Sequence, residues 1–280
     1  MENKLIINFI FSLGYRCNAA EFLIKYNLRK MSGPFDFMFI DFDSACKIIN
    51  NNFNNFLTDI VLLNINNKNI KLLYNNVNDI NLELHELIDK NIKFEELLYN
   101  NIDIYINQNY IENIDTDIYN WKKFCIFRHH NLSNKIEYDK IKYRVENFKN
   151  ITLKKLSEIG RSSNCAESLE LSDMRQLQMI PNNTCLLHIT KIINCTDINS
   201  YINEFINIKN RNNLYFYFII IICCNNLENN SFFLSNILFI IKKIDSSVHN
   251  TDELLNFDDE YNIVLNYFNI NLIEKNNMFY

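Results

Sequence analysis

The sequence predicts an α/β fold in a single domain that spans residues 1–280. Short apolar runs rich in Ile and Phe, such as Leu5–Leu13 and Leu214–Cys224, have the length and composition of buried strands. Between them lie segments in which apolar residues recur at every third or fourth position, as in amphipathic helices. The chain has only 3 Gly and 2 Pro, and no linker rich in these residues divides it into two parts.

The first two elements predict a tight turn between them. Leu5–Leu13 is followed directly by Gly14, a residue type that ends strands and permits turns. Helical spacing begins soon afterwards, and one face of that helix would carry Cys17, Ala20, Ile24 and Leu28. The sequence therefore predicts a strand, a turn and a helix with Cys17 in its first turn.

The remaining elements follow the same two patterns. Phe124–Phe127 and Cys185–Ile193 are further predicted strands, and Asn262–Leu272 is either a last strand or a short helix. The polar stretch Ser157–Asp173 is expected to form a long surface loop. Spacing at three and four residues predicts helices at Ser44–Phe56, Asn81–Leu98, Ile136–Leu156, Ile198–Ile208 and Phe232–Ile244.

Charge and hydropathy argue against two classes of partner. The net charge of -5 at pH 7 removes the broad basic surface that nucleic-acid phosphates require, so no nucleic-acid partner is expected. The longest apolar run, Leu214–Cys224, is well short of the roughly 20 residues that span a bilayer. Asn8 interrupts the apolar start of the chain, and no small-residue cleavage site follows it, so no signal peptide or membrane association is expected.

The 8 cysteines are expected to be reduced thiols in a cytoplasmic, reducing compartment. Disulfide scaffolds are short and dense in cysteine, and this chain is neither. No pair of cysteines has the CxxC spacing of a structural zinc site, so neither a metal nor another cofactor is expected. The oligomeric state is left open.

Asn and Ile, 51 and 43 residues, make up about a third of the chain, which indicates a coding bias towards A and T. Such a composition suits a large DNA virus or an intracellular organism. Against this bias, the segment from Gly14 to Ala45 gathers two of the three Gly, one of the two Pro and three of the four Ala. Gly and Pro are needed where the backbone must turn sharply or approach another group closely. The segment is therefore expected to have demanding geometry.

Cys17 is the candidate nucleophile. Backbone N–H groups at a helix N-terminus favour the thiolate and can also bind the oxyanion that forms when a thiolate attacks a carbonyl. Arg16 would add a neighbouring cation. The alternative is that Cys17 is a small core residue on the same helix face as Ala20, Ile24 and Leu28.

The candidate bases are His129 and His130, which follow the predicted strand Phe124–Phe127. Side chains at the end of a strand can project into a cleft. If the strand continues, Phe127 and His129 face one way and His130 faces outward, which favours His129. The alternative is a pair of surface imidazoles in a loop. The other three histidines lie in a charged helical stretch, inside a strand and in a polar run.

Several blocks of the sequence resemble a family of papain-like cysteine peptidases, a domain of otherwise unknown function. They include Ser12-Leu13-Gly14-x-x-Cys17 and Ser32-x-Pro34-Phe35-Asp36-Phe37, together with Leu28-Arg29, Phe127-x-His129, Tyr143-Arg144 and Phe148. The resemblance covers about residues 11–148. It implies a papain-like fold, Cys17 as nucleophile and His129 as base. Two positions depart from the family pattern: Phe37 replaces a usual Trp, and His130 replaces a frequent Asp, which leaves open which histidine acts.

The sequence thus predicts a cysteine-dependent acyl-transfer enzyme that acts on a peptide or another amide or ester substrate. Asp36 is the candidate to orient the imidazole because it belongs to the resembling block, and Asn225 is a second choice. Transfer to a sugar or amine in place of water stays open. The alternative function is a non-catalytic interaction protein that keeps the fold and has lost the chemistry.

Overall fold

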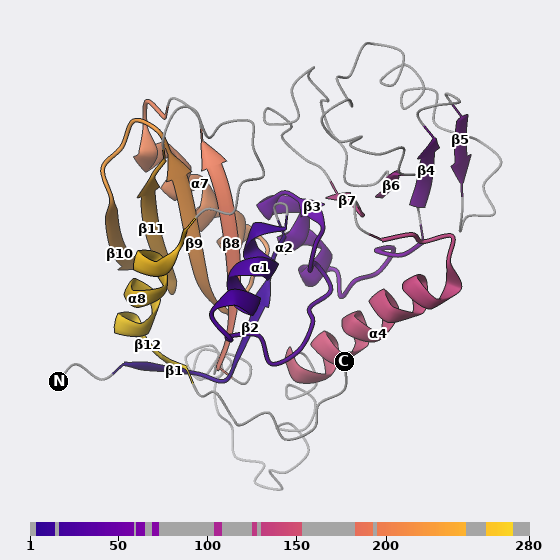
Figure 1. Ribbon diagram of the computed structural model, residues 1–280, viewed down its shortest axis with the longest axis horizontal. Coiled ribbons are helices and arrows are strands. Elements are labelled where there is room, and N and C mark those ends of the chain that lie inside the picture. The colour runs from indigo at the N-terminus through magenta and orange to yellow at the C-terminus, as the bar shows by residue number, and fades with distance from the viewer. Residues whose placement is uncertain are drawn as a thin grey trace, which may run out of the picture.

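A computed structural model describes residues 4–14, 17–58, 60–64, 69–72, 104–107, 125–127, 130–152, 183–192, 195–244 and 256–270. Its largest layer is a five-stranded sheet in the order β10-β11-β9-β8-β2 (Figure 1). β2 (Phe9–Ser12), β8 (Thr184–Ile192), β9 (Tyr217–Cys224) and β11 (Ile237–Lys243) are parallel, and β10 (Asn230–Leu234) is antiparallel at one edge. β2 is the opposite edge strand. The predicted α/β class agrees with this mixed architecture.

Helices cover both faces of this sheet, because its strands are apolar on both sides. α1 (Asn18–Lys25) and α8 (Asp258–Tyr267) pack on one face, with the two-stranded parallel sheet of β1 (Leu5–Ile7) and β12 (Phe268–Ile270) beside them (Figure 1). α2 (Phe42–Asn50) and α7 (Ile198–Arg211) pack on the other face. None of the helices described by the structure is long and apolar enough to cross a membrane.

A second five-stranded sheet has the order β3-β7-β6-β4-β5. It is antiparallel and comprises β3 (Phe39–Ile40), β4 (Ile60–Asn64), β5 (Asn69–Leu72), β6 (Ile104–Asn107) and β7 (Cys125–Ile126). α4 (Lys135–Thr152) follows β7 and runs below this sheet in the view of Figure 1. Ile141, Val145 and Phe148 bury one side of α4 in the core that α2 shares.

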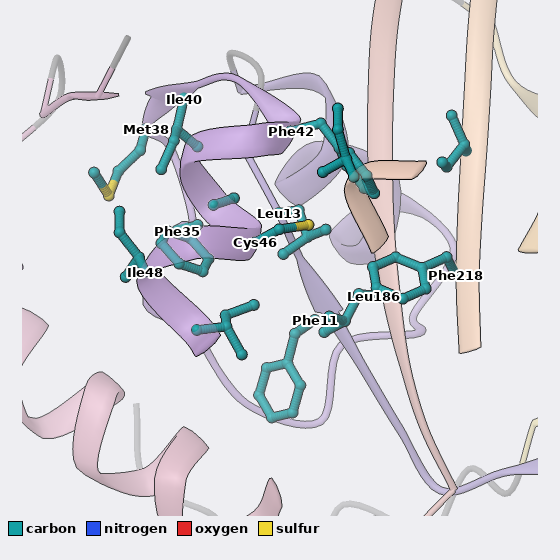
Figure 2. Packing of buried hydrophobic residues seen from close by; sticks show 14 of the residues in the cluster. Phe11, Leu13, Phe35, Met38, Ile40, Phe42, Cys46, Ile48, Leu186 and Phe218 are labelled. Atoms are coloured by element: carbon teal, nitrogen blue, oxygen red, sulfur yellow. The ribbon is translucent and has the colours of Figure 1, made fainter. Parts of the chain in front are cut away.

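The core around α2 joins the two sheets. Figure 2 shows Phe42 and Cys46 of α2 on the side of Leu186 and Phe218, which belong to the parallel sheet. Ile48 of the same helix lies on the other side, with Phe35, Met38 and Ile40. All of these residues are nearly or fully buried. The segment that leads into the second sheet is therefore packed against the first.

The main difference from the predicted elements is at Phe232–Ile244, which is a β-hairpin, not a helix. β10 and β11 pair in antiparallel register around Ser235 and Asn236. Both turn residues have positive φ, 54° and 63°, as a two-residue hairpin turn of this hand requires. The usual Asn-Gly signal is absent because Ser and Asn fill these positions. For Asn262–Leu272, both a strand and a short helix were expected as possible. The structure has the end of α8 followed by β12 there.

Other predicted elements agree in kind and shift at their ends. The predicted strands Cys185–Ile193 and Leu214–Cys224 correspond to β8 and β9. The first 17 residues of the predicted helix Ile136–Leu156 belong to α4. The predicted helix Asn81–Leu98 and the predicted loop Ser157–Asp173 lie outside the described residues.

The turn after β2 depends on Gly14, whose φ is +79°. A Cβ at this position would lie 2.3 Å from Ile40 Cγ2 and 3.2 Å from the carbonyl oxygen of Met38. The Gly14 N–H donates to Ser12 Oγ at 3.0 Å, which satisfies a buried donor as the chain leaves the sheet. The Ser-Leu-Gly block is thus explained by a positive φ, a close backbone approach and a local hydrogen bond.

His188 lies near the middle of β8 and is buried between aromatic rings. Its ring centroid is 5.2 Å from that of Phe42 and 6.1 Å from that of Phe205. Burial lowers the pKa of His188 from 6.5 to about 3. The imidazole is therefore neutral in the folded protein at physiological pH.

We predict that Gly14→Ala destabilises the protein by about 2–5 kcal/mol, from left-handed backbone strain together with the clash against Ile40. Gly33→Ala is a matched control, because Gly33 has no positive φ and its added Cβ would meet Phe11 Cδ1 at 3.2 Å. Its cost should be about 1 kcal/mol. Urea unfolding of the two variants measures both values, and equal midpoints would contradict the proposed role of Gly14.

We predict that His188→Leu makes the free energy of unfolding less dependent on pH below about pH 6.5. Above pH 6.5 the imidazole is neutral in both states, so it contributes no pH dependence. Between pH 6.5 and about 3 the unfolded chain binds a proton that the folded chain excludes, so the wild type loses about 2 kcal/mol at pH 5 through this group. The difference in unfolding free energy between variant and wild type should shift by that amount from pH 8 to pH 5. Parallel profiles would exclude a neutral buried His188.

Candidate active site

Cys17 is the N-cap residue of α1 and lies just beyond the carboxyl end of β2. Its φ and ψ are -73° and -22°, and its carbonyl accepts the N–H of Glu21 at 2.9 Å, the first hydrogen bond of the helix. The side chain is half-buried. The backbone N–H groups of the next residues belong to the first helical turn, where they have no intrahelical acceptor. Cys17 therefore lies where a thiolate and an oxyanion are both favoured.

Cys17 makes no capping hydrogen bond to this turn. By contrast, the Asp41 and Asp197 side chains cap α2 and α7 through N–H groups of the first turn at 2.9–3.2 Å. Phe257, the N-cap of α8, also makes no capping hydrogen bond, but Asn256 Oδ1 accepts the Asp258 N–H at 3.2 Å and three acidic residues occupy the first turn. A cysteine at the N-cap forgoes a hydrogen bond commonly worth about 1 kcal/mol. This choice of residue is not explained by helix stability.

The alternative in which Cys17 belongs to a core face is not supported by the neighbouring side chains. Ala19, Ala20, Phe22 and Leu23 are the buried residues of α1. Ile24 is 46% exposed, so the face drawn through Cys17, Ala20 and Ile24 is not the buried one. Leu28 is buried but lies beyond the end of the helix.

His130 is buried, which corrects the expectation that it faces outward. β7 ends at Ile126, and the His130 N–H donates to the Phe127 carbonyl at 3.3 Å, so the chain turns and the strand alternation is lost. Nε2 of His130 donates to the backbone carbonyl of Asp36 at 3.1 Å, since a carbonyl can only accept. Nδ1 lies 4.0 Å from Glu137 Oε2. His129, the predicted base, lies outside the described residues.

Asp36 is the anionic centre of a buried charge cluster. Its Oδ2 accepts from Arg29 Nη1 and from the Gly33 N–H, both at 3.0 Å. Burial raises the pKa of the Asp36 carboxyl, while the positive charges of Arg29 and Arg144 and the Gly33 N–H oppose that rise. Oδ1 accepts no hydrogen bond from any residue that the structure describes. One carboxylate oxygen is therefore committed to the loop, and the other has unused acceptor capacity.

The segment from Asp36 to Ile40 contacts both parts of the predicted site. At its start, the carbonyl of Asp36 binds His130. At its end, Met38 and Ile40 surround Gly14, three residues before Cys17. β3 lies within this segment and pairs antiparallel with β7, with Phe39 opposite Ile126 and Ile40 opposite Cys125. Gly14 and His130 thus both contact one short stretch of backbone.

The aromatic residues of the resembling blocks form the support of this stretch. Phe35 packs against Phe53 and Phe56, each with ring centroids 5.6 Å apart. The ring of Phe127 lies 5.4 Å from that of Phe56, and the ring of Phe148 lies 5.5 Å from that of Phe53. Phe148 also meets Phe11 of β2 at 5.0 Å. The motif phenylalanines therefore act through packing.

The sequence did not single out Glu137, and it gave no role to Arg144. Both are on α4, seven residues apart and so on one helical face, the side that also buries Ile141 and Phe148. The negative charge of Glu137 faces His130, and the charges of Asp36 and Glu137 oppose the fall that burial imposes on the pKa of Arg144. The sequence does carry a signal for Glu137 and Arg144, because both are charged residues on the apolar side of an amphipathic helix.

Asn225, the second choice for a third catalytic residue, follows β9. Ser12 at the end of β2 is level with Leu187, whereas Cys224 is level with Ile192, five residues or about 16 Å further along β8. This register separates the two strand ends. Within the described ranges, no three His, Cys, Asp or Glu side chains form a group that could hold a metal ion.

Comparison with known protein families matches residues 8–196 to a family described as "Putative papain-like cysteine peptidase". The match extends beyond the expected range of about 11–148 and includes β8 of the parallel sheet. No curated protein and no solved structure matches the chain. The matched region is about two thirds of the chain and contains Cys17, Asp36, His129 and the charge cluster. The chain therefore belongs to the putative papain-like cysteine peptidase family.

Proposed function

We propose that this protein is a cysteine-dependent acyl-transfer enzyme, a peptidase or a related enzyme, in which Cys17 is the nucleophile and His129 the base. One observation carries the proposal: Cys17 begins a helix directly after an edge strand, on a turn packed against the same backbone stretch that binds the residue after His129. A nucleophile and its base must come within hydrogen-bond reach, and this topology supports that approach.

The proposed reaction proceeds in two steps. The Cys17 thiolate attacks the carbonyl carbon of an amide or ester, and the oxyanion is stabilised by the N–H groups of the first turn of α1. The imidazolium of His129 then protonates the leaving amine or alcohol, and an acyl-enzyme remains on Cys17. A water molecule, deprotonated by His129, releases the acid and regenerates the thiol. An amine or sugar hydroxyl in place of water would make the same protein a transferase.

His129 is favoured over His130 because the His130 ring is committed elsewhere. Nε2 of His130 donates to the Asp36 carbonyl, and Nδ1 lies 4.0 Å from the Glu137 carboxylate, so the ring is held within the support of the site. A base needs one nitrogen directed at the thiol. In this proposal His130 fixes the backbone beside His129 and does not exchange protons with substrate.

Asp36 is the proposed orienting residue for His129. Its Oδ1 is buried and has acceptor capacity left over from the salt bridge with Arg29. An imidazole N–H donated to that oxygen would fix the ring tautomer, as a third residue does in other catalytic triads. We further propose a cytoplasmic, reducing location and a peptide or acyl substrate, with neither nucleic acid nor membrane as a partner.

The second candidate is a non-catalytic interaction protein that retains the fold. It is favoured by Glu21, an acidic residue in the first turn of α1, four residues after Cys17. A carboxylate at that spacing opposes a thiolate. The departures from the family pattern at Phe37 and His130 also favour the non-catalytic function. Thiol reactivity distinguishes the two functions.

We predict that His129→Ala lowers the rate of Cys17 alkylation at pH 6 by at least about tenfold. An ordinary thiol with a pKa near 8.5 is only about 0.3% thiolate at this pH, so rapid reaction requires a paired base. Iodoacetamide labelling with peptide mapping of Cys17 measures the rate. A cysteine-directed acylating probe should label the wild type and fail to label both Cys17→Ala and His129→Ala.

His130→Ala and Asp36→Asn complete this comparison. If His130→Ala lowers the rate and His129→Ala does not, the base is His130 and the assignment is wrong by one residue. If neither changes it, the non-catalytic function is favoured. Asp36→Asn should lower the rate less than His129→Ala does, because it removes the orienting group and leaves the base. Near-ultraviolet circular dichroism of each variant checks that the fold is kept.

We predict that Glu21→Gln raises the alkylation rate of Cys17 at pH 6 about twofold, since it removes a like charge one helical turn away. Glu204→Gln on α7 is the matched control, an exposed helical glutamate of a different element, and should leave the rate unchanged. Added salt should reduce the effect of Glu21→Gln by screening. A rate that falls would show that Glu21 assists the thiol.

A further inference from the structure

A pair of cysteines lies at the carboxyl end of the parallel sheet, separate from Cys17. Cys224 is the last residue of β9, and Cys195 follows β8 two residues before Asp197, the N-cap of α7. β8 and β9 are adjacent strands, paired in register as far as Ile192 and Cys224. The two cysteines therefore lie at the same end of the sheet, Cys195 just after β8 and Cys224 at the last residue of β9.

The two cysteines are neighbours, and one residue bridges them. The Cys224 thiol acts on the Cys195 thiol by charge and by hydrogen bonding, and both effects raise the pKa of Cys195. Cys224 Sγ also donates to Asn226 Oδ1 at 2.8 Å, and Asn226 Nδ2 donates to the Cys195 carbonyl at 2.7 Å. A single carboxamide thus binds the side chain of one cysteine and the backbone of the other.

The pair lies just beneath the surface. Cys195 keeps 4% of its surface exposed, and Cys224 has none. Asn226, which accepts the hydrogen bond of the Cys224 thiol, is itself exposed. The polar partner of this thiol is therefore a side chain at the protein surface. Cys223, next in sequence, belongs to the core on the opposite face of the sheet.

We propose that Cys195 and Cys224 are a reversible dithiol modification site, which closes to a disulfide by exchange with a small disulfide such as oxidised glutathione. In the first step the Cys195 thiolate attacks one sulfur of the reagent, forms a mixed disulfide and releases one glutathione thiolate. In the second step the Cys224 thiolate attacks Cys195 Sγ and releases the second. Two protein thiols are oxidised and one glutathione disulfide is reduced to two thiols.

Closure would link the end of β9 to the residue that follows β8, around a loop of chain that contains α7 and β9. A cross-link between residues 195 and 224 restrains the unfolded chain more than the folded one, because Asn226 already holds the two cysteines beside each other in the fold. The oxidised protein should therefore unfold at a temperature several degrees higher. Burial and the neighbouring Cys224 raise the pKa of the Cys195 thiol, so exchange should become faster from pH 7 to pH 8.5.

The test uses the full chain treated with oxidised glutathione, digested with trypsin without reduction and analysed by mass spectrometry. Lys191 and Lys209 bound a peptide whose only cysteine is Cys195, while Cys223 and Cys224 share the peptide from residue 212 to Lys242. The expected product is a disulfide between these two peptides, in the wild type and equally in Cys223→Ser. Cys224→Ser should stop at a glutathione adduct on Cys195.

Two results would overturn the proposal. One is a stable glutathione adduct on Cys195 in the wild type, which would show that Cys224 cannot resolve it. The other is no reaction of either thiol in the folded protein at pH 8.5, with ready reaction in denaturant. Both measurements use the wild type, so they hold even if a serine variant does not fold. Cys17→Ala should leave the cross-link unchanged, which separates this site from the proposed catalytic one.

Discussion

The salt bridge between Asp36 and Arg29 is the interaction on which the rest of the site depends. The Asp36 carboxylate is almost wholly buried, and it binds both Arg29 and the Gly33 N–H. These bonds fix the loop after α1, which places the Asp36 carbonyl against His130 and directs Met38 and Ile40 toward Gly14. Removing one partner of such a pair leaves an uncompensated charge in the interior. The loop geometry and the charge pairing are therefore a single constraint.

Strands β8 and β9 could be predicted because both faces are buried and their sequences are almost continuously apolar. The hairpin of β10 and β11 could not, because Ile-rich sequence suits either element and the turn uses Ser235 and Asn236 instead of glycine. The position of Cys17 at the start of a helix could be predicted because an apolar run, a glycine and a helical period follow one another. His130 was placed wrongly because the alternation argument needs a strand that continues, and β7 has only two residues.

The resembling blocks divide into two physical roles. Phe35, Phe127 and Phe148 form an aromatic support, while Arg29, Asp36 and Arg144 form the charge cluster beside it. Residues far apart in sequence thus serve packing and charge balance together, which a linear pattern does not reveal. Family membership rests on the match over residues 8–196, and the acyl-transfer chemistry is a separate proposal.

The missing cap at Cys17 has a consequence for motion. A helix that starts without a side-chain acceptor frays more readily at its first turn, so the N–H groups there exchange with solvent faster than those of capped helices. α1 has only 8 residues, and its first turn is a large part of it. The start of this helix should open locally at lower free energy than the starts of α2 and α7. A polar carbonyl bound at Cys17 would accept those N–H groups, so binding itself would complete the helix.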